Sequence, residues 1–565
     1  MREVRKPIQS INKVTIPSKL QIIALGGAGD IGKNMLAFRY EDDLFVVDAG
    51  VQFPNEEQPG VDLIIPDFTY LRQNSSNLRA IVLTHAHEDH IGALPYLLRE
   101  LTIPVYSTRL TLGLVRMKCE EHRLPALDLR EITPGQMIEI GSFQVEAVRV
   151  THSIPDTVSL AVHSPVGTIV HTGDFKIDAS PIDGKHFDAQ RFAELGDQGV
   201  LLLISDSVNA EKKGWVPSES FVGTVFDREI RAATGRVFVT TFASNIHRVQ
   251  QVFDTAARYG RKVAVAGRSM VRNIEVASEL GYLNMTGVDR IKVEQIDDFH
   301  PAEVIILTTG SQGEPLSGLT RMSRDDHKIQ IMPGDTVILS STPIPGNEDA
   351  IWRTVNRLFR RGARVIYDLL TPVHASGHAN QEELKMMLNL TRPKYIIPYH
   401  GEPRHIFAYT EMAVSMGIST DRILPLEIGD VLELDHDTAA YGERVPAGSV
   451  LVDGVSSAGV SEVILRDRRH LSQDGTVVVT LSLDRNTGEV LAGPELISRG
   501  FLHPEDSEGL FEEARTLIVE ELETLTSDAE TGWDEAQSHI REVLVRFFNR
   551  KTRRRPVVIP VISEI

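Results

Sequence analysis

Apolar residues in the first part of the chain fall in short runs separated by turn residues, a pattern typical of β-strands. From Leu20 these runs read LQIIALGG, MLAFRY and LFVVDAG, and the polar stretch 41–43 between the last two predicts a hairpin. The hairpin matters because GAGDIG, with Gly27, Gly29 and Gly32, fits the glycine pattern of a dinucleotide-binding loop. That loop requires a helix next, to place its N-terminus on the pyrophosphate. We therefore predict a tight turn here rather than a nucleotide site.

The following strand leads into a cluster of residue types that bind metal ions. IVLTHAHEDH at 81–90 places His85, His87, Asp89 and His90 within six positions, directly after apolar β-formers. Borderline and hard divalent cations prefer imidazole and carboxylate ligands. At an extended strand end the first two histidines project to the same side, and the acid and histidine on the turn beyond reach a second ion. The spacing predicts two metal ions side by side; the alternative is a surface turn that happens to be rich in histidine and acid.

Further apolar strands along the chain end in residues of the same chemistry. Polar residues at the carboxyl ends of strands line the crevice of an open sheet, where sites usually lie. Each residue alone is as consistent with a turn or a helix N-cap, but five of them together with the histidine cluster indicate one shared site. The five are Asp48, His152, Asp174, Asp206 and His400.

Strands and helices alternate from about 216 to 375, as in a doubly wound α/β domain. GRVFVTT, a helix over Arg248–Tyr259, and KVAVAG are examples. Near the end of this region, TPVHASGH places His374 and His378 on either side of small residues, ahead of a helix that begins near NQEEL. Backbone N–H groups and the positive end of a helix suit a phosphate. Two surface histidines in a loop are the alternative.

The pattern changes again from about 446. A linker-like segment leads to a hairpin of GTVVVTLSL and EVLAG that turns at Asn486-Thr487-Gly488. Two amphipathic helices follow, around Glu508–Leu525 and Asp534–Phe548. The chain then has a basic run, RKTRRR, which is more often a solvated helix end than an RNA contact, and an apolar strand, PVVIPVI. That strand pairs either within this small domain or across a subunit interface.

Composition narrows the classes of protein. A chain of 565 residues is long enough for several domains with substantial cores. The single cysteine, Cys119, excludes an intramolecular disulfide and cysteine-based zinc sites, and it suits a reducing compartment. The N-terminus lacks the apolar core of a signal peptide, and no apolar run reaches the roughly 18 residues that span a bilayer. We therefore expect a cytoplasmic enzyme with no membrane association.

The net charge of −19 argues against a histone-like nucleic-acid coat protein. It does not exclude a nuclease, because metal ions supply positive charge where the phosphate lies, and basic patches are local. Charge alone therefore leaves nucleic acid open as a substrate.

Taken together, these motifs resemble those of the metallo-β-lactamase superfamily, of its β-CASP nucleases and, within them, of the ribonuclease J family. The signature residues are Asp48, HAHEDH at 85–90, His152 and Asp174, and the residues similar to β-CASP motifs A, B and C are Asp206, His378 and His400. The resemblance continues into VDG and ILRDRR, covers nearly the whole chain, and departs from the pattern at no ligand position.

For the fold, the resemblance implies an α/β protein: a metallo-β-lactamase αββα sandwich interrupted by a β-CASP α/β domain, followed by a small C-terminal α+β domain. The expected boundaries are an N-terminal arm at 1–19, the metallo-β-lactamase domain at 20–215 and 376–445, the β-CASP domain at 216–375, a linker at 446–469 and the C-terminal domain at 470–565.

For the metal site, the resemblance implies two zinc ions per subunit, or manganese instead, because manganese also accepts histidine and carboxylate. Residue matching assigns His85, His87 and His152 to one ion, Asp89, His90 and His400 to the other, and Asp174 to both.

The resemblance also implies roles around the metal ions. Asp48 would orient a ligand by accepting its hydrogen bond. Asp206 and His378 are both candidates for protonating the leaving group and contacting phosphate, and the sequence leaves open which of them gives the proton. Some family members carry a structural calcium ion, for which Asp62 and Asp453 are the candidate ligands.

The activity that the resemblance implies is hydrolysis of single-stranded RNA, both as a 5′-to-3′ exonuclease and as an endonuclease, in rRNA processing and mRNA decay. Such enzymes favour a 5′-monophosphate end, which charge-assisted donors hold. The residues resembling that pocket are Ser244, Asn245, His247, Arg248, Arg268, His374, Ala375, Ser376, Gly377 and His378. The alternative for His247 and Arg248 is the start of an exposed helix.

The resemblance can be weighed against three rival functions, and it also implies partners for the protein. A small-molecule hydrolase such as a glyoxalase or lactonase shares the histidine cluster, but it lacks the large insert and HASGH. DNA-preferring relatives tend to carry Val at motif C, so His400 favours RNA. A catalytically inactive RNA-binding scaffold is disfavoured because every ligand position is filled. Family members commonly dimerise through the C-terminal domain, so we expect a homodimer or a dimer of dimers, and membership of an RNA-degradation complex.

Overall fold

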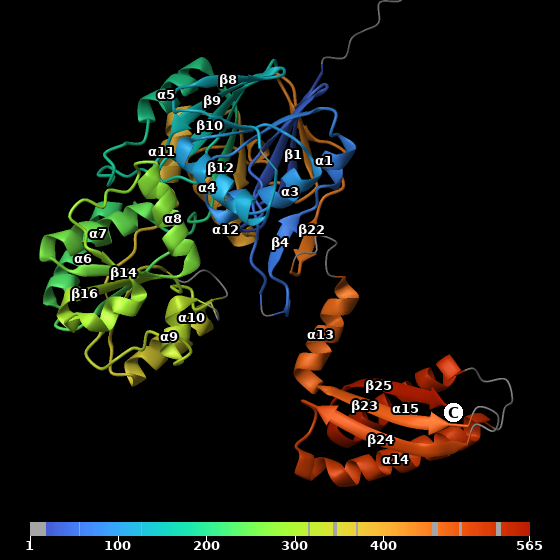
Figure 1. Cartoon of the computed structure of the whole chain (residues 1–565). Helices are drawn as coiled ribbons and strands as arrows, with labels where there is room; N and C mark the ends of the chain where they lie inside the picture. The colour runs from blue at the N-terminus through green and yellow to red at the C-terminus, as the bar shows by residue number, and fades with distance from the viewer. Residues whose placement is uncertain are drawn as a thin grey trace, which may run out of the picture. The chain divides into compact units, whose positions relative to one another are not determined.

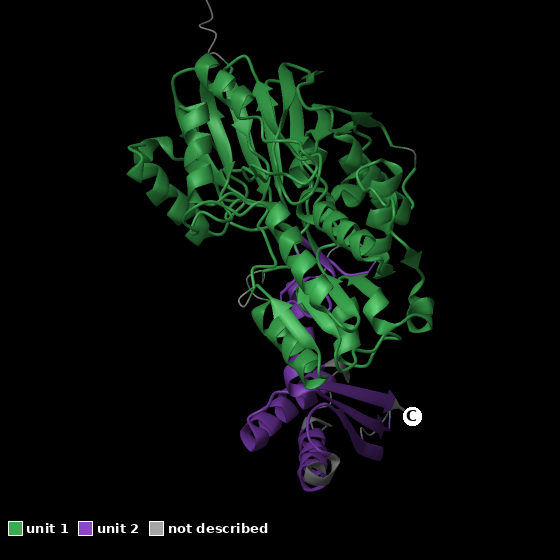
Figure 2. Ribbon diagram, turned by 90° about the vertical axis from the view of Figure 1, so that its left-hand side faces the viewer, with its two compact units in different colours: residues 1–52, 64–449 green, residues 53–63, 450–565 purple. Residues whose placement is uncertain are grey.

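The computed structural model divides into two compact units (Figure 2). The first contains residues 1–52 and 64–449, and the second contains 53–63 and 450–565. The structure describes residues 18–565 except 56, 126, 315–316, 343–346, 369–370, 455–460, 485–488 and 527–532. Most of the expected arm at 1–19 and the expected turn at Asn486-Thr487-Gly488 lie outside the described residues.

Two β-sheets form the centre of the first unit (Figure 1). An eight-stranded sheet has the order β21-β20-β1-β2-β3-β5-β6-β7, and a six-stranded sheet has the order β19-β12-β11-β10-β9-β8. The strands of the first sheet are β1 (Leu20–Gly26), β2 (Met35–Tyr40), β3 (Asp43–Val47), β5 (Leu78–Val82), β6 (Val105–Ser107), β7 (Leu129–Glu131), β20 (Val431–Leu434) and β21 (Ala439–Tyr441). Those of the second are β8 (Met137–Ile140), β9 (Phe143–Arg149), β10 (Val158–His163), β11 (Thr168–His171), β12 (Val200–Asp206) and β19 (Tyr395–Tyr399).

The two sheets share one apolar core. Phe38 and Phe45 of the first sheet belong to the same buried cluster as Leu160 and Phe143 of the second. The rings of Phe38 and Phe45 stack with centroids 4.9 Å apart, and Phe143 meets Phe45 edge-on at 5.0 Å. Burial of such apolar surface is the dominant favourable contribution to folding. It fixes the sheets face to face, with their loops free to form a site.

Helices cover the outer faces of the sandwich. Leu203 and Ile396 on the far side of the second sheet pack in one cluster with side chains of helices α5, α11 and α12, such as Phe192, Met387 and Tyr409. Helix α4 contacts β6 and β7 of the first sheet. These layers confirm the expected αββα sandwich. The helices are α1 (Thr69–Gln73), α2 (Glu88–Ile91), α3 (Leu94–Glu100), α4 (Arg109–Glu121), α5 (Ala189–Gln198), α11 (Gln381–Thr391) and α12 (Pro403–Ser415), with a 3-10 turn η3 (Thr420–Arg422).

A third sheet lies within the chain between β12 and β19. Its order is β15-β14-β16-β13-β17-β18, and every pair in it is parallel. Strands β12 and β19 are nonetheless parallel neighbours in the sandwich, so this α/β domain is an insertion. Its elements are α6 (Glu219–Ala232), β13 (Val237–Thr240), α7 (Ile246–Tyr259), β14 (Lys262–Ala266), α8 (Arg268–Glu279), β15 (Arg290–Ile291), η1 (Val293–Asp298), η2 (Pro301–Glu303), β16 (Val304–Thr308), α9 (Gly318–Ser323), β17 (Thr336–Leu339), α10 (Glu348–Arg360) and β18 (Arg364–Tyr367).

The second unit holds a three-stranded sheet of order β24-β23-β25 beside two long helices. The terminal strand β25 pairs in parallel with β23, so of the two alternatives for this strand the structure has pairing within the domain. The range 446–469, expected as a linker, includes strand β22 and part of helix α13. The elements here are β22 (Ser449–Val452), α13 (Glu462–Asp474), β23 (Thr476–Leu483), β24 (Val490–Arg499), α14 (Pro504–Thr526), α15 (Trp533–Thr552) and β25 (Val557–Glu564); strand β4 spans Leu63–Pro66.

Residues 53–63 belong to the second unit although they come early in the chain. The N–H of Gly454 donates to Asp62 Oδ2 at 2.7 Å, and the N–H of Asp62 donates to the carbonyl of Val452 at 2.9 Å. Arg468 Nη1 donates to the carbonyl of Gly60 at 3.0 Å. The segment is therefore fastened to the region around helix α13 by backbone and side-chain hydrogen bonds.

No helix among the described residues combines the length and the apolar character that crossing a bilayer requires.

Candidate metal centre

Seven imidazole and carboxylate side chains converge where strands of the two sheets end. The structure brings together every residue that the sequence suggests as a ligand: His85, His87, Asp89, His90, His152, Asp174 and His400. They follow strands β5, β9, β11 and β19 or lie in helix α2. Strand β5 ends at Val82, so the histidine pair lies beyond the strand, and His90 lies in a short helix rather than a turn.

The first group of ligand atoms is formed by three rings and one carboxylate. His87 Nδ1 lies 3.0 Å from His85 Nε2 and 3.1 Å from His152 Nε2. Asp174 Oδ2 lies 3.5 Å from the same atom of His85 and 3.7 Å from that of His152. Ring nitrogens converging so closely are expected around a shared cation.

The second group of ligand atoms lies around the same carboxylate oxygen. Asp174 Oδ2 lies 3.2 Å from His90 Nε2 and 3.6 Å from His400 Nε2. Asp89 Oδ2 lies 3.5 Å and 3.6 Å from the same two nitrogens. One oxygen of Asp174 is therefore shared between two groups of donors, which suits two cations side by side.

The protonation states of the first group suit metal binding. Burial lowers the pKa of the His85 and His152 rings far below its usual value and that of His87 to about 4. Neutral imidazole is the form that binds a metal ion. Burial would raise the pKa of Asp174, but the surrounding imidazoles outweigh it and keep the carboxylate ionised.

The second group shows an excess of negative charge that a cation would balance. Burial would lower the pKa of His90, but Asp174, Asp89 and Asp48 outweigh it and raise the pKa well above its usual value. The same three carboxylates would favour a divalent cation beside this ring. The donor set thus fits two divalent cations bound by histidine and carboxylate.

A set of hydrogen bonds behind the ligands orients their rings. Asp48 accepts from Thr84 N at 2.8 Å, from Thr84 Oγ1 at 2.9 Å and from His90 Nδ1 at 2.8 Å. His85 Nδ1 lies 3.0 Å from Thr84 Oγ1, and His152 Nδ1 lies 2.7 Å from the carbonyl oxygen of Gly377. Partners of this kind fix which ring nitrogen faces a metal ion.

The glycine-rich turn lies at the edge of this site. The N–H of His400 donates to the carbonyl of Gly27 at 3.1 Å, and the Tyr399 hydroxyl donates to that of Gly26 at 2.6 Å. Strand β2 follows the turn, so the helix that a dinucleotide loop needs does not follow here. The structure thus bears out the expected turn.

A further pair of titratable residues lies beside the two groups. His378 Nδ1 lies 2.9 Å from Asp206 Oδ2 and 3.9 Å from Asp174 Oδ2. Burial would lower the pKa of His378, but Asp206 and Asp174 raise it to about 9. In the absence of cations, these two carboxylates therefore favour the protonated ring at neutral pH.

Comparison with known proteins matches each part of the chain to a described domain. Family models match residues 43–201 (beta-lactamase superfamily domain), 234–358 (ribonuclease J, beta-CASP domain), 363–422 (Zn-dependent metallo-hydrolase RNA specificity domain) and 463–565 (ribonuclease J C-terminal domain). Ribonuclease J of Thermus thermophilus is 46% identical over 559 residues, which cover 96% of this chain and 95% of that protein. The chain belongs to the ribonuclease J family. Ribonuclease J2 of Bacillus subtilis is 42% identical, with 97% and 99% covered.

Family membership and the matched domains make the chain a hydrolytic nuclease with a metallo-β-lactamase core. A solved structure of a protein of unknown function from Enterococcus faecalis V583 is also similar, with a TM-score of 0.52 and 16% identity. It covers 74% of this chain and 100% of that one, and at this identity the likeness supports the fold alone.

The residues expected to hold a 5′-phosphate differ in their burial and hydrogen bonding. Asn245 Oδ1 accepts from Arg248 N at 3.1 Å and caps helix α7, and Ser244 is partly exposed just before it. His247 and Arg248 are buried, so the exposed helix start that we considered is wrong. Arg268 is exposed at the start of α8.

Arg248 differs most from its expected role as a direct phosphate contact. Its side chain is fully buried, and protein acceptors already surround its guanidinium group, so it has no N–H left for a phosphate. The side chains of His374 and Ser376 lie on the loop that Arg248 contacts, and Ala375 and Gly377 offer carbonyl groups there. This loop therefore supports the metal centre, in addition to any role in holding a phosphate.

The two residues expected to bind calcium, Asp62 and Asp453, already interact with other residues of the chain. Asp453 forms an ion pair with Arg468, and Asp62 Oδ2 accepts from Gly454 N. The nearby arginine already balances one of the two charges. A cation here would compete with Arg468 for Asp453.

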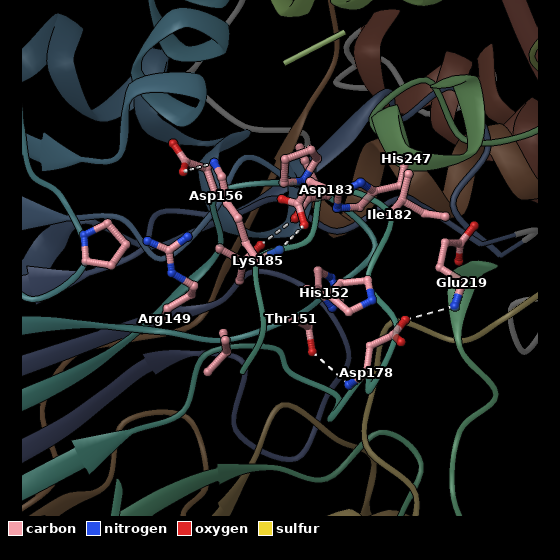
Figure 3. A pocket seen from close by; sticks show the side chains of 16 residues that line it. Arg149, Thr151, His152, Asp156, Asp178, Ile182, Asp183, Lys185, Glu219 and His247 are labelled. Carbon is pink, nitrogen blue, oxygen red and sulfur yellow. Dashed lines mark hydrogen bonds and ion pairs between the residues drawn. The ribbon is translucent and has the colours of Figure 1, made fainter. Parts of the chain in front are cut away.

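Several residues around the site carry no recognisable signal in the local sequence. Asn209 Nδ2 donates to Ser376 Oγ at 2.8 Å and to the carbonyl of His378 at 2.9 Å. Figure 3 shows a pocket whose lining includes His152, Asp178 and Glu219. Glu219 lies just after a helix N-cap, an ordinary surface position by its local pattern, so only the tertiary structure reveals its burial.

Proposed function

We propose that this chain is a metal-dependent ribonuclease that hydrolyses phosphodiester bonds of single-stranded RNA at a pair of divalent cations. We further propose that it acts as a 5′-to-3′ exonuclease with endonuclease activity, prefers a 5′-monophosphate end, and serves RNA processing and decay. The single observation that carries the metal assignment is the Asp174 Oδ2 atom, which lies within 3.7 Å of four imidazole nitrogens from two groups.

Each group would hold one cation, with Asp174 shared. The first group is His85, His87 and His152, and the second is Asp89, His90 and His400. Two cations in such a site supply Lewis acidity and lower the pKa of water toward neutrality. Zinc fits the histidine-rich donor set, and manganese accepts the same ligands.

The protein's own residues would then manage the proton of the leaving group. Cleavage expels a 3′-oxygen, which needs a proton. His378 is the candidate donor because Asp206 and Asp174 raise its pKa to about 9, which favours the protonated ring, and Asp206 receives the hydrogen bond of its Nδ1. With Nδ1 bound to Asp206, the Nε2–H of the protonated ring would remain to donate to the 3′-oxygen. Asp206 is then the orienting partner, and His378 is the acid.

The RNA substrate and the partners rest on the family. Relatives of this chain are named ribonuclease J, and one matched domain is described as an RNA specificity domain. A homodimer or dimer of dimers through residues 470–565, and membership of a degradation complex, are proposals of the same standing. So is a structural calcium ion at Asp62 and Asp453.

One experiment tests activity, direction and metal together. An RNA labelled at its 3′ end, with either a 5′-monophosphate or a 5′-triphosphate, is incubated with the protein before chelation, after it, and after each metal is added back. We expect hydrolysis that stops on chelation, resumes with zinc or manganese, and is faster with the monophosphate. Undiminished hydrolysis in excess chelator would exclude the metal assignment.

A matched pair of variants completes the design. His87→Ala removes a ring shared by two contacts at 3.0 and 3.1 Å and should abolish hydrolysis while circular dichroism stays native. His436→Ala changes an exposed histidine in the turn after β20 and should leave the rate unchanged. Hydrolysis of a lactone or thioester by the unmodified protein, without RNA cleavage, would favour the small-molecule hydrolase instead.

A further inference from the structure

A buried ion pair in the inserted α/β domain lies at the centre of a hydrogen-bond network. Arg248 in α7 is fully buried and Glu219 in α6 is nearly so, with side chains 0% and 3% exposed. Nε of Arg248 donates to Glu219 Oε1 and Nη2 to Oε2, both at 2.9 Å. This parallel two-bond arrangement is the strongest form of the arginine–carboxylate contact.

The remaining N–H groups of Arg248 bind two loops. Nη1 donates to the carbonyl of Ser340 at 2.7 Å and lies 3.0 Å from His374 Nδ1, and Nη2 donates to the carbonyl of Ala375 at 3.2 Å. Burial, together with the charge of Arg248, lowers the pKa of His374 well below its usual value, so its ring is neutral and Nδ1 can accept. A guanidinium has five N–H groups, and all five have a partner here.

The loop that Arg248 holds reaches the metal centre two residues later. The carbonyl oxygen of Gly377 lies 2.7 Å from His152 Nδ1, so it accepts that N–H and turns Nε2 toward His87 and Asp174. No side chain larger than hydrogen fits at this position without a shift, because a Cβ on Gly377 would lie 2.5 Å from Cε1 of the same ring. The position of this loop therefore sets the orientation of His152.

A second path leads from the backbone of Glu219 back to His152. The N–H of Glu219 donates to Asp178 Oδ2 at 2.9 Å, and the N–H of Asp178 donates to Thr151 Oγ1 at 3.1 Å. Thr151 directly precedes His152, and Figure 3 shows these residues lining one pocket. The two paths form a closed ring of contacts that begins at Arg248 and Glu219 and meets at His152.

We propose that the Arg248–Glu219 pair positions His152 and so sets the affinity of the protein for the cation of the first group. The pair acts through the loop at 374–377 and through Asp178, not by touching substrate. It thereby makes metal binding in the sandwich depend on the folding of the inserted domain. The inference rests on the proposed metal centre and adds a positioning residue pair to it.

The test compares variants of the full-length, metal-loaded protein. Glu219→Gln keeps the shape of the side chain but removes its charge, and Arg248→Lys keeps a charge but cannot reach all the acceptors. Metal affinity is measured by competition with a chromogenic chelator, and kcat and KM are measured on a 5′-monophosphate RNA. We expect one cation per chain to bind about 10- to 100-fold more weakly, the range typical of lost ligand-orienting partners, and kcat to fall while KM stays unchanged.

A second buried arginine–carboxylate pair in the same domain supplies the control. Arg236 Nε and Nη2 donate to Asp335 at 3.1 and 2.7 Å, with side chains 10% and 4% exposed. Arg236 also donates to the carbonyl of Gln330, and none of its hydrogen bonds within the described chain goes to residues 374–378. Asp335→Asn should lower the melting temperature as Glu219→Gln does, but leave metal affinity and kcat unchanged.

Specific outcomes would overturn the proposal. If Arg248→Lys raises KM or removes the preference for a 5′-monophosphate while metal affinity stays full, Arg248 contacts phosphate instead. If Asp335→Asn weakens metal binding equally, the effect is one of general stability. Should the single variants not fold, the double variant Glu219→Gln, Arg248→Gln leaves no uncompensated charge, and full metal affinity in it would refute the positioning role. An unmodified protein that binds no cation would instead refute the proposed function.

Discussion

The close contact between Gly377 and His152 provides the sharpest test of how the metal centre is built. A Cβ at position 377 would lie 2.5 Å from Cε1 and 2.7 Å from Nδ1 of the imidazole, and 3.0 Å from Ser153 Oγ. The shortest of these is about 0.9 Å closer than the 3.4 Å at which ordinary contact begins. The Gly377→Ala variant must therefore move either the ring or the loop.

The expected loss of activity and of stability in Gly377→Ala follows from that displacement. A misplacement of about 1 Å costs roughly 100-fold in rate, or about 2.7 kcal/mol of transition-state stabilisation. Overpacking a well-filled site costs about 1–3 kcal/mol of folding free energy, while replacing glycine with alanine recovers about 0.4–1 kcal/mol through the unfolded chain. The fold should thus survive with a small loss of stability, and the activity of Gly377→Ala should fall about 100-fold.

The assay measures kcat/KM on a 5′-monophosphate RNA, bound metal by elemental analysis, and unfolding by urea. Gly448→Ala is the matched control, because nothing lies within 4 Å of a Cβ built at that position. It should leave kcat/KM and bound metal unchanged, and it should raise the free energy of unfolding by about 0.4–1 kcal/mol, because alanine restricts the unfolded chain more than glycine does. An unaltered kcat/KM in Gly377→Ala would mean that the contact does not position His152, and the reasoning from the loop to the metal ligand would fail.

Three further outcomes follow from the structure. Asp48→Asn removes the charge that accepts the His90 Nδ1 hydrogen bond at 2.8 Å, and it should weaken metal binding or activity about 10- to 100-fold by the measurements just described. The pKa of His378 is raised to about 9, and the acid must carry its proton, so kcat should fall as the pH rises through about 9. Asp206→Asn lacks the charge that raises this pKa most, so its pH–rate profile should show the fall at lower pH. Burial raises the pKa of the Cys119 thiol to about 11, so a thiol reagent at pH 7 should react with one equivalent only after unfolding; rapid labelling of the native protein would contradict its burial.

The sequence locates the residues that meet at the candidate metal centre because their signal is local. Asp48 and His400 each follow an apolar strand by one residue, and strand ends in a sandwich lie on a common edge. Both residues also adopt a positive φ, 62° and 53°, where the strand turns sharply into its loop. Apolar runs and turn residues likewise located the hairpin after the glycine-rich turn and both C-terminal helices.

The supporting network could not be predicted from the sequence, because its members owe their roles to tertiary contacts. Arg248 and Glu219 are 29 residues apart and each has the pattern of an exposed helix position, yet they are buried together. An arginine near a suspected phosphate pocket suggests a direct contact. Only its five acceptor atoms, on four residues of the protein, reveal that it binds Glu219 and two loops instead. Similarly, the carbonyl of Gly377 carries no side-chain signal at all.

The early segment 53–63 has a consequence for dissecting the protein. Its hydrogen-bond partners are Val452, Gly454 and Arg468, which come about 400 residues later in the chain. Cutting the gene before codon 450 would therefore not excise the last unit cleanly. It would leave behind an eleven-residue remnant, without these hydrogen-bond partners, near the start of the remaining chain. Protease nicks in such a truncated protein should begin there.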